Sequence, residues 1–148
     1  MSEKRNVQIL IVEDEAGDAR LMELALHKSG FAMDLSTVND GHEALRFMRR
    51  EDERFLQAPR PDLVLLDLKM PGQSGLEFLA AMKQDARLCA IPVVVVTTSA
   101  LDADVSASYL GGVAGYISKP NDMNEFVAAI SKLCQYWCNL VRLPENPE

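Results

Sequence analysis

Side chains suited to phosphate chemistry follow four short apolar segments of the sequence. Glu13 and Asp14 come directly after the first segment, and Asp67, Thr97 and Lys119 each follow a later one. An acidic residue in such a place is often no more than a helix cap. Agreement at four segment ends instead indicates one shared site, because α/β folds bind ligands where the carboxyl ends of their parallel strands meet.

These residue types fit phosphoryl transfer. Asp67 supplies a carboxylate nucleophile, which would become an acyl phosphate. Crowded carboxylates repel one another, and a hard divalent cation such as Mg²⁺ relieves that repulsion while holding the phosphoryl oxygens. Lys119 supplies a positive charge and Thr97 a hydroxyl donor. The pair can therefore sense whether phosphate is present on Asp67.

The elements that must position this site are short buried strands alternating with amphipathic helices. Unbroken apolar runs are typical of strands covered on both faces of a parallel sheet. Capping signals at 40–43 and 122–125 predict two of the helix starts. The expected strands are 9–12, 32–38, 63–66, 93–96 and 115–118, and the expected helices are 18–29, 40–50, 76–85, 102–110 and 123–141.

Five strand–helix repeats predict an α/β fold in which a doubly wound, five-stranded parallel sheet carries helices on both faces. A length of 148 residues with 48% apolar content favours one domain. The formal charge of -7 disfavours nucleic-acid binding. Three cysteines without a CxxC or zinc pattern suit a reducing cytoplasm, and the apolar run at 7–12 is too short for a signal peptide or a membrane span.

In combination these motifs resemble the response-regulator receiver domains of two-component signalling, typified by the chemotaxis protein CheY. The matching parts are Glu13-Asp14, the segment 67–75, Thr97 and the segment 115–120. The resemblance implies the flavodoxin-like strand order 2-1-3-4-5. The resemblance covers residues 7–133. These residues are the expected core of a single domain at 1–143, in which 134–143 is a helical extension, and residues 144–148 are expected to be a flexible tail.

Roles for individual residues are also implied by the resemblance. Asp67 would accept a phosphoryl group from a histidine kinase, and Asp14 and Asp67 would ligate Mg²⁺ directly. Glu13 would act through a water, and the backbone carbonyl of Lys69 would complete the protein ligands. Tyr116 matches an aromatic switch position, acting together with Thr97, although an amphipathic strand residue is an equally good interpretation of that tyrosine.

A narrower resemblance is to the small response regulators paired with bacterial phytochromes. It is carried by the insertion at 51–61, the segment 97–99 and the extension at 136–144. It implies that the sensor kinase is a bacteriophytochrome and that homodimers form through the segments 102–110, 115–118 and 123–141. The receiver resemblance uses nearly all of the chain, so no DNA-binding output domain is expected and the signal would pass to an unknown downstream protein.

Three other functions share part of this chemistry or of this fold. A haloacid-dehalogenase-type phosphohydrolase also uses an Asp nucleophile and Mg²⁺, but it wants a second Asp two residues later, where this chain has Lys69. A flavodoxin-like cofactor carrier would need a phosphate loop after Val12. An interaction module with the receiver fold but without phosphorylation would act by protein binding alone and would catalyse no reaction.

The final helix has a wide apolar arc. One stripe is assigned to packing on the sheet, and a second stripe beside it is assigned to a two-fold dimer contact. The alternative is that the chain after residue 141 folds back over the second stripe. The first stripe consists of Phe126, Ile130, Leu133 and Trp137, and the second of Val127, Cys134, Cys138 and Val141.

Overall fold

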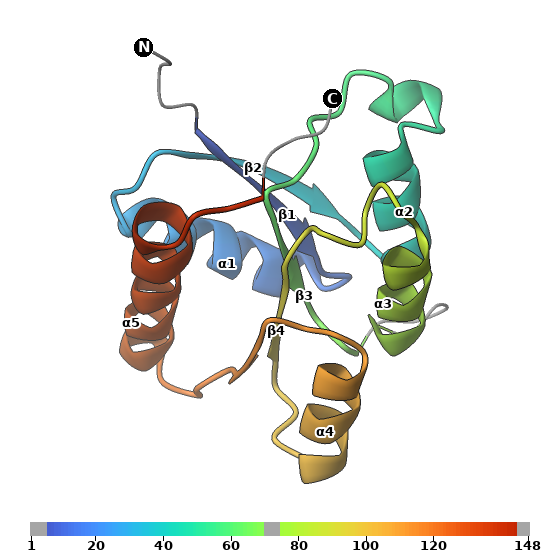
Figure 1. Ribbon diagram of the computed structural model, residues 1–148. Coiled ribbons are helices and arrows are strands. Elements are labelled where there is room, and N and C mark those ends of the chain that lie inside the picture. The colour runs from blue at the N-terminus through green and yellow to red at the C-terminus, as the bar shows by residue number, and fades with distance from the viewer. Residues whose placement is uncertain (1–5, 70–74, 145–148) are drawn as a thin grey trace.

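Five parallel strands form one sheet with helices on both of its faces (Figure 1). The structure is a computed structural model and describes residues 6–69 and 75–144. The strand order is β2-β1-β3-β4-β5, so the expected fold class and strand order are confirmed. The strands are β1 (Val7–Val12), β2 (Met33–Val38), β3 (Leu63–Leu66), β4 (Val93–Thr97) and β5 (Gly115–Ser118).

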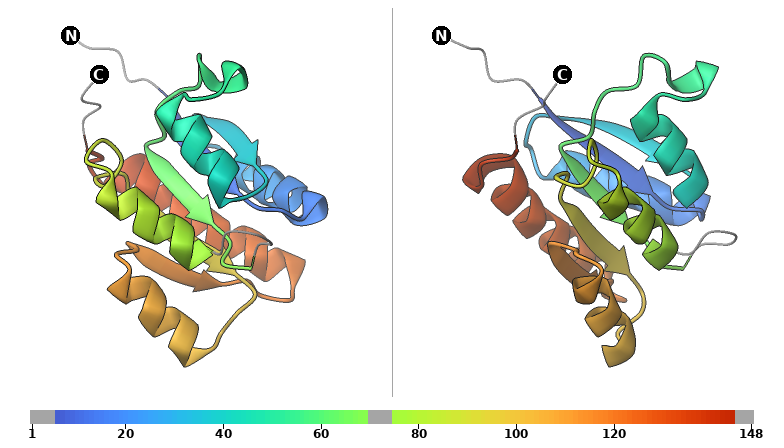
Figure 2. Two further views of the ribbon diagram at one scale, coloured as in Figure 1. Left: turned by 90° about the vertical axis from the view of Figure 1, so that its right-hand side faces the viewer. Right: turned by 45° about the vertical axis from the view of Figure 1, so that its right-hand side comes forward.

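Two apolar clusters hold the helices to the sheet. One joins α2 and α3 to one face, and the other joins α1 and α5 to the opposite face, an arrangement that can be followed in Figure 2. Within the described ranges, no helix is long and apolar enough to cross a membrane. The helices are α1 (Ala16–Lys28), α2 (Gly41–Arg49), α3 (Gly75–Gln84), α4 (Asp102–Leu110) and α5 (Met123–Cys134).

Helix starts follow the capping chemistry of the sequence. The Asp40 carboxylate accepts a hydrogen bond from the Glu43 N–H at 2.8 Å, and Asp122 accepts one from Glu125 at 3.0 Å. Both predicted capping signals are therefore confirmed. Helix α1 begins earlier than the predicted Asp18, because the Glu15 side chain accepts from the Gly17 N–H at 2.9 Å and caps the helix.

The last helix differs from the expected continuous helix at 123–141. Its α-helical part ends at Cys134, and a π-helical turn η2 (Gln135–Leu140) follows. Trp137 and Cys138 in this turn still pack against the core. An apolar pattern at α-helical spacing does not distinguish hydrogen bonds between residues four apart from those between residues five apart, so the change could not be predicted from the sequence.

The two stripes of α5 have different outcomes. Phe126, Ile130 and Leu133 are buried against the sheet, as expected for the first stripe. Cys134 is also fully buried, so its assignment to an exposed dimer stripe is wrong. The reason is that α1 packs beside α5 and covers that side of it within one chain. The large apolar side chains that are exposed in α5 and η2 are Met123, Tyr136 and Leu140.

Parallel pairing brings the carboxyl ends of four strands to one edge. Val12 pairs with Leu66, and Thr97 with Ser118, so the residues that follow them meet there. The insertion before β3 carries the 3-10 turn η1 (Glu53–Phe55) at the other end of the sheet. Residues 70–74 of the predicted motif at 67–75, and residues 145–148 of the predicted tail, lie outside the described residues.

Candidate functional site

Asp67 lies at the centre of the site, directly after β3. Its side chain is buried, and one carboxylate oxygen accepts hydrogen bonds from the Thr97 hydroxyl at 2.9 Å and the Lys69 N–H at 3.0 Å. The other oxygen lies 3.4 Å from the Lys119 ammonium. Thr97 is fully buried at the end of β4. Three of the predicted residues therefore converge on one carboxylate.

Glu13, directly after β1, is the second buried carboxylate of the site. It is hydrogen-bonded to Asp67, and its side chain accepts from Lys119 at 3.1 Å and from the Glu15 N–H at 3.2 Å. The Lys119 ammonium is therefore shared between two carboxylates, with Asp18 a third at 3.8 Å. Only about a tenth of the Lys119 side chain is exposed, so these ion pairs are shielded from solvent.

The two carboxylates have opposite pKa shifts. Burial, the hydrogen bond with Asp67 and the charge of Asp67 raise the pKa of Glu13 to about 7. Burial opposes ionisation of Asp67 too, but the hydrogen bonds from Glu13 and Lys69 and the charge of Lys119 lower its pKa overall. The carboxylates overcome burial and raise the pKa of Lys119. At neutral pH, Asp67 is therefore an anion beside a cation, as a nucleophile in phosphoryl transfer should be.

The raised pKa of Glu13 makes folding stability depend on pH. The native protein retains a proton that the unfolded chain loses from about pH 4.5 upwards, so the free energy of unfolding falls as pH rises from there through about 7. We expect Glu13→Gln to be more stable than the parent by about 2 kcal/mol at pH 8 in EDTA, with no difference at pH 4. Urea unfolding at both pH values measures this.

Glu53→Gln, which removes an exposed carboxylate in η1, is the matched control. It should change the free energy of unfolding by less than about 0.5 kcal/mol at both pH values. Equal stability of Glu13→Gln and the parent at pH 8 would contradict the crowding of the two carboxylates.

Asp14 stands apart from the buried pair. It is exposed, next to Glu13. Among the residues that the structure describes, no group of three His, Cys, Asp or Glu side chains is close enough to hold a metal ion. The Mg²⁺ ligands expected at Glu13, Asp14, Asp67 and the Lys69 carbonyl therefore stay a prediction. Their chemistry fits that cation, because all are oxygen donors and the buried pair carries a proton that a cation can replace.

The predicted switch residue Tyr116 is half-buried on β5. Its hydroxyl donates to the Ser99 carbonyl, in the loop after β4, at 3.0 Å. The ring also packs against the cluster on the α2 and α3 side of the sheet. Tyr116 thus connects β5 to a loop that begins one residue after Thr97. This contact supports the switch interpretation without testing it.

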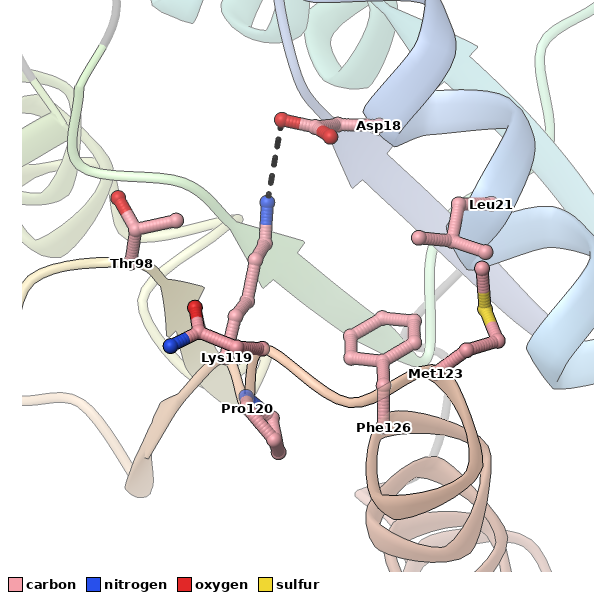
Figure 3. Close-up of a pocket in the computed structure, with 8 residues that line it drawn as sticks. Asp18, Leu21, Thr98, Lys119, Pro120, Met123 and Phe126 are labelled. Carbon is pink, nitrogen blue, oxygen red and sulfur yellow. Dashed lines mark ion pairs between the residues drawn. The ribbon is translucent and has the colours of Figure 1, made fainter.

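A cavity of about 190 Å³ opens beside Lys119, between α1 and the start of α5 (Figure 3). Asp18 and Lys119 point toward each other across it, and Leu21, Met123 and Phe126 form its apolar side. Asp18 was missed in the sequence, since an acidic residue in the first turn of a helix is usually explained by the helix dipole. No local pattern in the sequence connects it to Lys119.

A doubly wound sheet with an Asp, a Thr and a Lys converging at its carboxyl edge defines the receiver class of signalling domain. A model of the response regulator receiver domain matches residues 9–131, so the chain belongs to the response regulator receiver family. Receiver domains in general bind Mg²⁺ and are phosphorylated by histidine kinases. The haloacid-dehalogenase and flavodoxin alternatives are thereby excluded.

Relatives include single-domain phytochrome response regulators. The chain is 38% identical to the response regulator Rcp1 of Synechocystis over 136 residues, 92% of each protein. It matches the phosphorylated cyanobacterial phytochrome response regulator RcpA with a TM-score of 0.89 at 38% identity, covering 95% of this chain and 100% of that one. A Mn²⁺-bound form of Rcp1 matches with a TM-score of 0.86 at 37% identity, covering 94% and 99%.

Proposed function

We propose that this protein is a response regulator that accepts a phosphoryl group on Asp67 from a histidine kinase and signals through phosphorylation-dependent protein contacts. The observation that carries the proposal is the buried, ionised Asp67 held by Thr97, Lys69 and Lys119. The likeness to Rcp1 and RcpA supports a phytochrome as the kinase.

The reaction forms a bond between phosphorus and a carboxylate oxygen of Asp67 and breaks the P–N bond of phosphohistidine. The electron pair of the broken bond stays on the departing imidazole nitrogen of the kinase. Lys119 stabilises the charge on the phosphoryl oxygens. The Thr97 hydroxyl, which is hydrogen-bonded to Asp67 in the unphosphorylated protein, turns to donate to one of these oxygens. Bound Mg²⁺ would neutralise the remaining negative charge, held by Glu13, Asp14, Asp67 and the Lys69 carbonyl. The chain's own part is to keep the nucleophile ionised and oriented.

The proposal is tested with a small phosphodonor, phosphoramidate or acetyl phosphate, in the presence of Mg²⁺. A receiver gives a stoichiometric adduct on the protein. No adduct with either donor, in a folded protein, would favour the remaining alternative, an interaction module without phosphorylation.

Asp14 tests the metal part of the proposal. Asp14→Ala should weaken Mg²⁺ binding about tenfold or more, because it removes a direct oxygen ligand. Isothermal titration calorimetry measures the affinity. Asp18→Ala is the matched control, since it removes a nearby carboxylate outside the proposed ligand set and should weaken binding far less. Equal affinities in Asp14→Ala and the parent would remove Asp14 from the ligands.

We also propose self-association through α4, β5 and α5. These elements, together with η2, line an open groove of about 440 Å³ whose aromatic residues are Tyr109, Tyr116, Tyr136 and Trp137. No residue of β5 is fully buried, and the Tyr109 and Tyr136 side chains are about half exposed. A sheet edge flanked by exposed aromatic side chains is a surface that a second copy can cover.

Charged substitutions in this groove should yield folded monomers. We expect Tyr136→Glu and Tyr109→Glu to lower the dimer affinity at least about tenfold, because each would bury a charge in the contact. Light scattering over a concentration series, with and without phosphodonor, measures the mass. Leu56→Glu, at an exposed apolar residue in the insertion, should leave the dimer intact. A parent that stays monomeric at every concentration, phosphorylated or not, would contradict the proposal.

A further inference from the structure

Ser99 lies two residues after Thr97 and is almost fully buried. Its backbone carbonyl accepts two hydrogen bonds from β5, from the Tyr116 hydroxyl at 3.0 Å and from the Ser118 hydroxyl at 3.2 Å. The residue between Thr97 and Ser99, Thr98, lines the cavity beside Lys119. Ser99 is therefore held to β5 through its main chain, close to the phosphoacceptor site.

The side chain of Ser99 makes a separate set of contacts to α4. Its hydroxyl donates to the Asp104 carboxylate at 2.5 Å and accepts from the Leu101 N–H at 3.4 Å. In the described structure the cap residue of α4, Leu101, makes no side-chain cap hydrogen bond of its own. Ser99 thus satisfies the N–H of the cap residue and holds an acidic side chain of the first helical turn.

Few other contacts hold α4. Ser108 is the one buried residue of this helix, which the structure describes in full, and Tyr109 and Leu110 are exposed. Ser108 itself bonds within the helix, donating to the Asp104 carbonyl at 2.7 Å. A helix with so little buried apolar surface opens easily, so a charge-assisted hydrogen bond at its start has a large share in fixing it.

We propose that Ser99 is a positioning residue that couples α4 to the phosphoacceptor site, with its hydroxyl holding Asp104 of α4 and its carbonyl held by Tyr116 and Ser118 of β5. Ser99 follows Thr97 by two residues, so a movement of Thr97 toward a phosphoryl group also moves Ser99. Through the hydrogen bond to Asp104, Ser99 then moves the first turn of α4. The inference rests on the proposed phosphorylation of Asp67 and adds one contact, the hydrogen bond between the Ser99 hydroxyl and the Asp104 carboxylate, through which its effect reaches α4.

Amide hydrogen exchange of residues 100–108 tests the link in unphosphorylated protein. We expect exchange to rise about tenfold in Ser99→Ala and in Asp104→Ala. The double variant should match Ser99→Ala, because the hydrogen bond between Ser99 and Asp104 is already absent from that single variant. Asp102→Ala, which removes the other acidic residue of the same helical turn, should raise exchange far less. Ser99→Thr keeps the hydroxyl and should show the exchange rate of the parent. Asp104→Asn keeps an acceptor oxygen and should do the same, which provides a second conservative variant if threonine does not fit at position 99.

The same measurement after treatment with phosphoramidate and Mg²⁺ tests the coupling. The parent should show altered exchange in α4, whereas Ser99→Ala and Asp104→Ala should be labelled as the parent is and lose that alteration. A full α4 response in labelled Asp104→Ala, additive effects in the double variant, or an equal loss in Asp102→Ala would overturn the inference. If the parent itself is not labelled, the proposed function fails, and the unphosphorylated comparison still decides whether the Ser99–Asp104 link exists.

Discussion

Asp67→Asn should reduce labelling by phosphoramidate at least roughly a thousandfold, to background, while the protein stays folded. The amide of Asn cannot act as the nucleophile. Its oxygen can still accept from Thr97 and from the Lys69 N–H, and its nitrogen can donate to Glu13, so the contacts around the site are largely kept. Intact-mass spectrometry gives the extent of labelling, and thermal unfolding should give a Tm within a few degrees of the parent.

Asp18→Asn is the control for this experiment. Asp18 is a carboxylate of the same pocket that lies 3.8 Å from the Lys119 ammonium, and about half of its side chain is exposed. It should be labelled to the same extent as the parent. Undiminished labelling of Asp67→Asn at the native site would remove Asp67 as the phosphoacceptor.

Lys119→Ala should have the second largest effect, by separating phosphorylation from its consequences. Without the ammonium, the phosphoryl group on Asp67 loses the cation that connects it to the end of β5, where Lys119 also donates its N–H to the Thr97 carbonyl. Labelling should continue at a lower rate. The effect of phosphorylation on hydrogen exchange in β5 and α4 should fall from severalfold in the parent to nearly none in Lys119→Ala. The reason is that the phosphorylated and unphosphorylated states no longer differ in a charge contact at position 119.

Lys119→Arg keeps the charge and should retain part of the response. In the absence of phosphodonor, Lys119→Ala should also be less stable than the parent by about 1–3 kcal/mol in EDTA at pH 8, since Glu13 and Asp67 then face each other without a cation. A phosphorylated Lys119→Ala protein that responds as strongly as the phosphorylated parent would show that Lys119 does not carry the switch.

Much of this site could be predicted because strand ends are readable in a sequence. Glu13, Asp67, Thr97 and Lys119 each follow a buried apolar run, and parallel topology then leaves one edge where they can meet. The same logic does not reach residues whose partners lie on loops or helices. Asp18 resembles an ordinary first-turn acid until Lys119 is seen 3.8 Å away.

Ser99 and the second stripe of α5 show the same limit. The hydroxyl of Ser99 has no local pattern that points to Asp104, because the bond depends on how the loop after β4 turns. Cys134 was placed on an apolar stripe for a dimer contact, but α1 covers it within one chain. Periodicity shows that a face must be buried, and only the packing of α1 against α5 shows by what.

The most direct test of the central claim is to locate the phosphoryl group. The protein is treated with phosphoramidate and Mg²⁺, digested, and its peptides are analysed by mass spectrometry with and without hydroxylamine, which cleaves acyl phosphates. We predict a single Mg²⁺-dependent, hydroxylamine-sensitive phosphoryl group on Asp67. A phosphoryl group on any other residue, or none on the folded protein, would contradict the account.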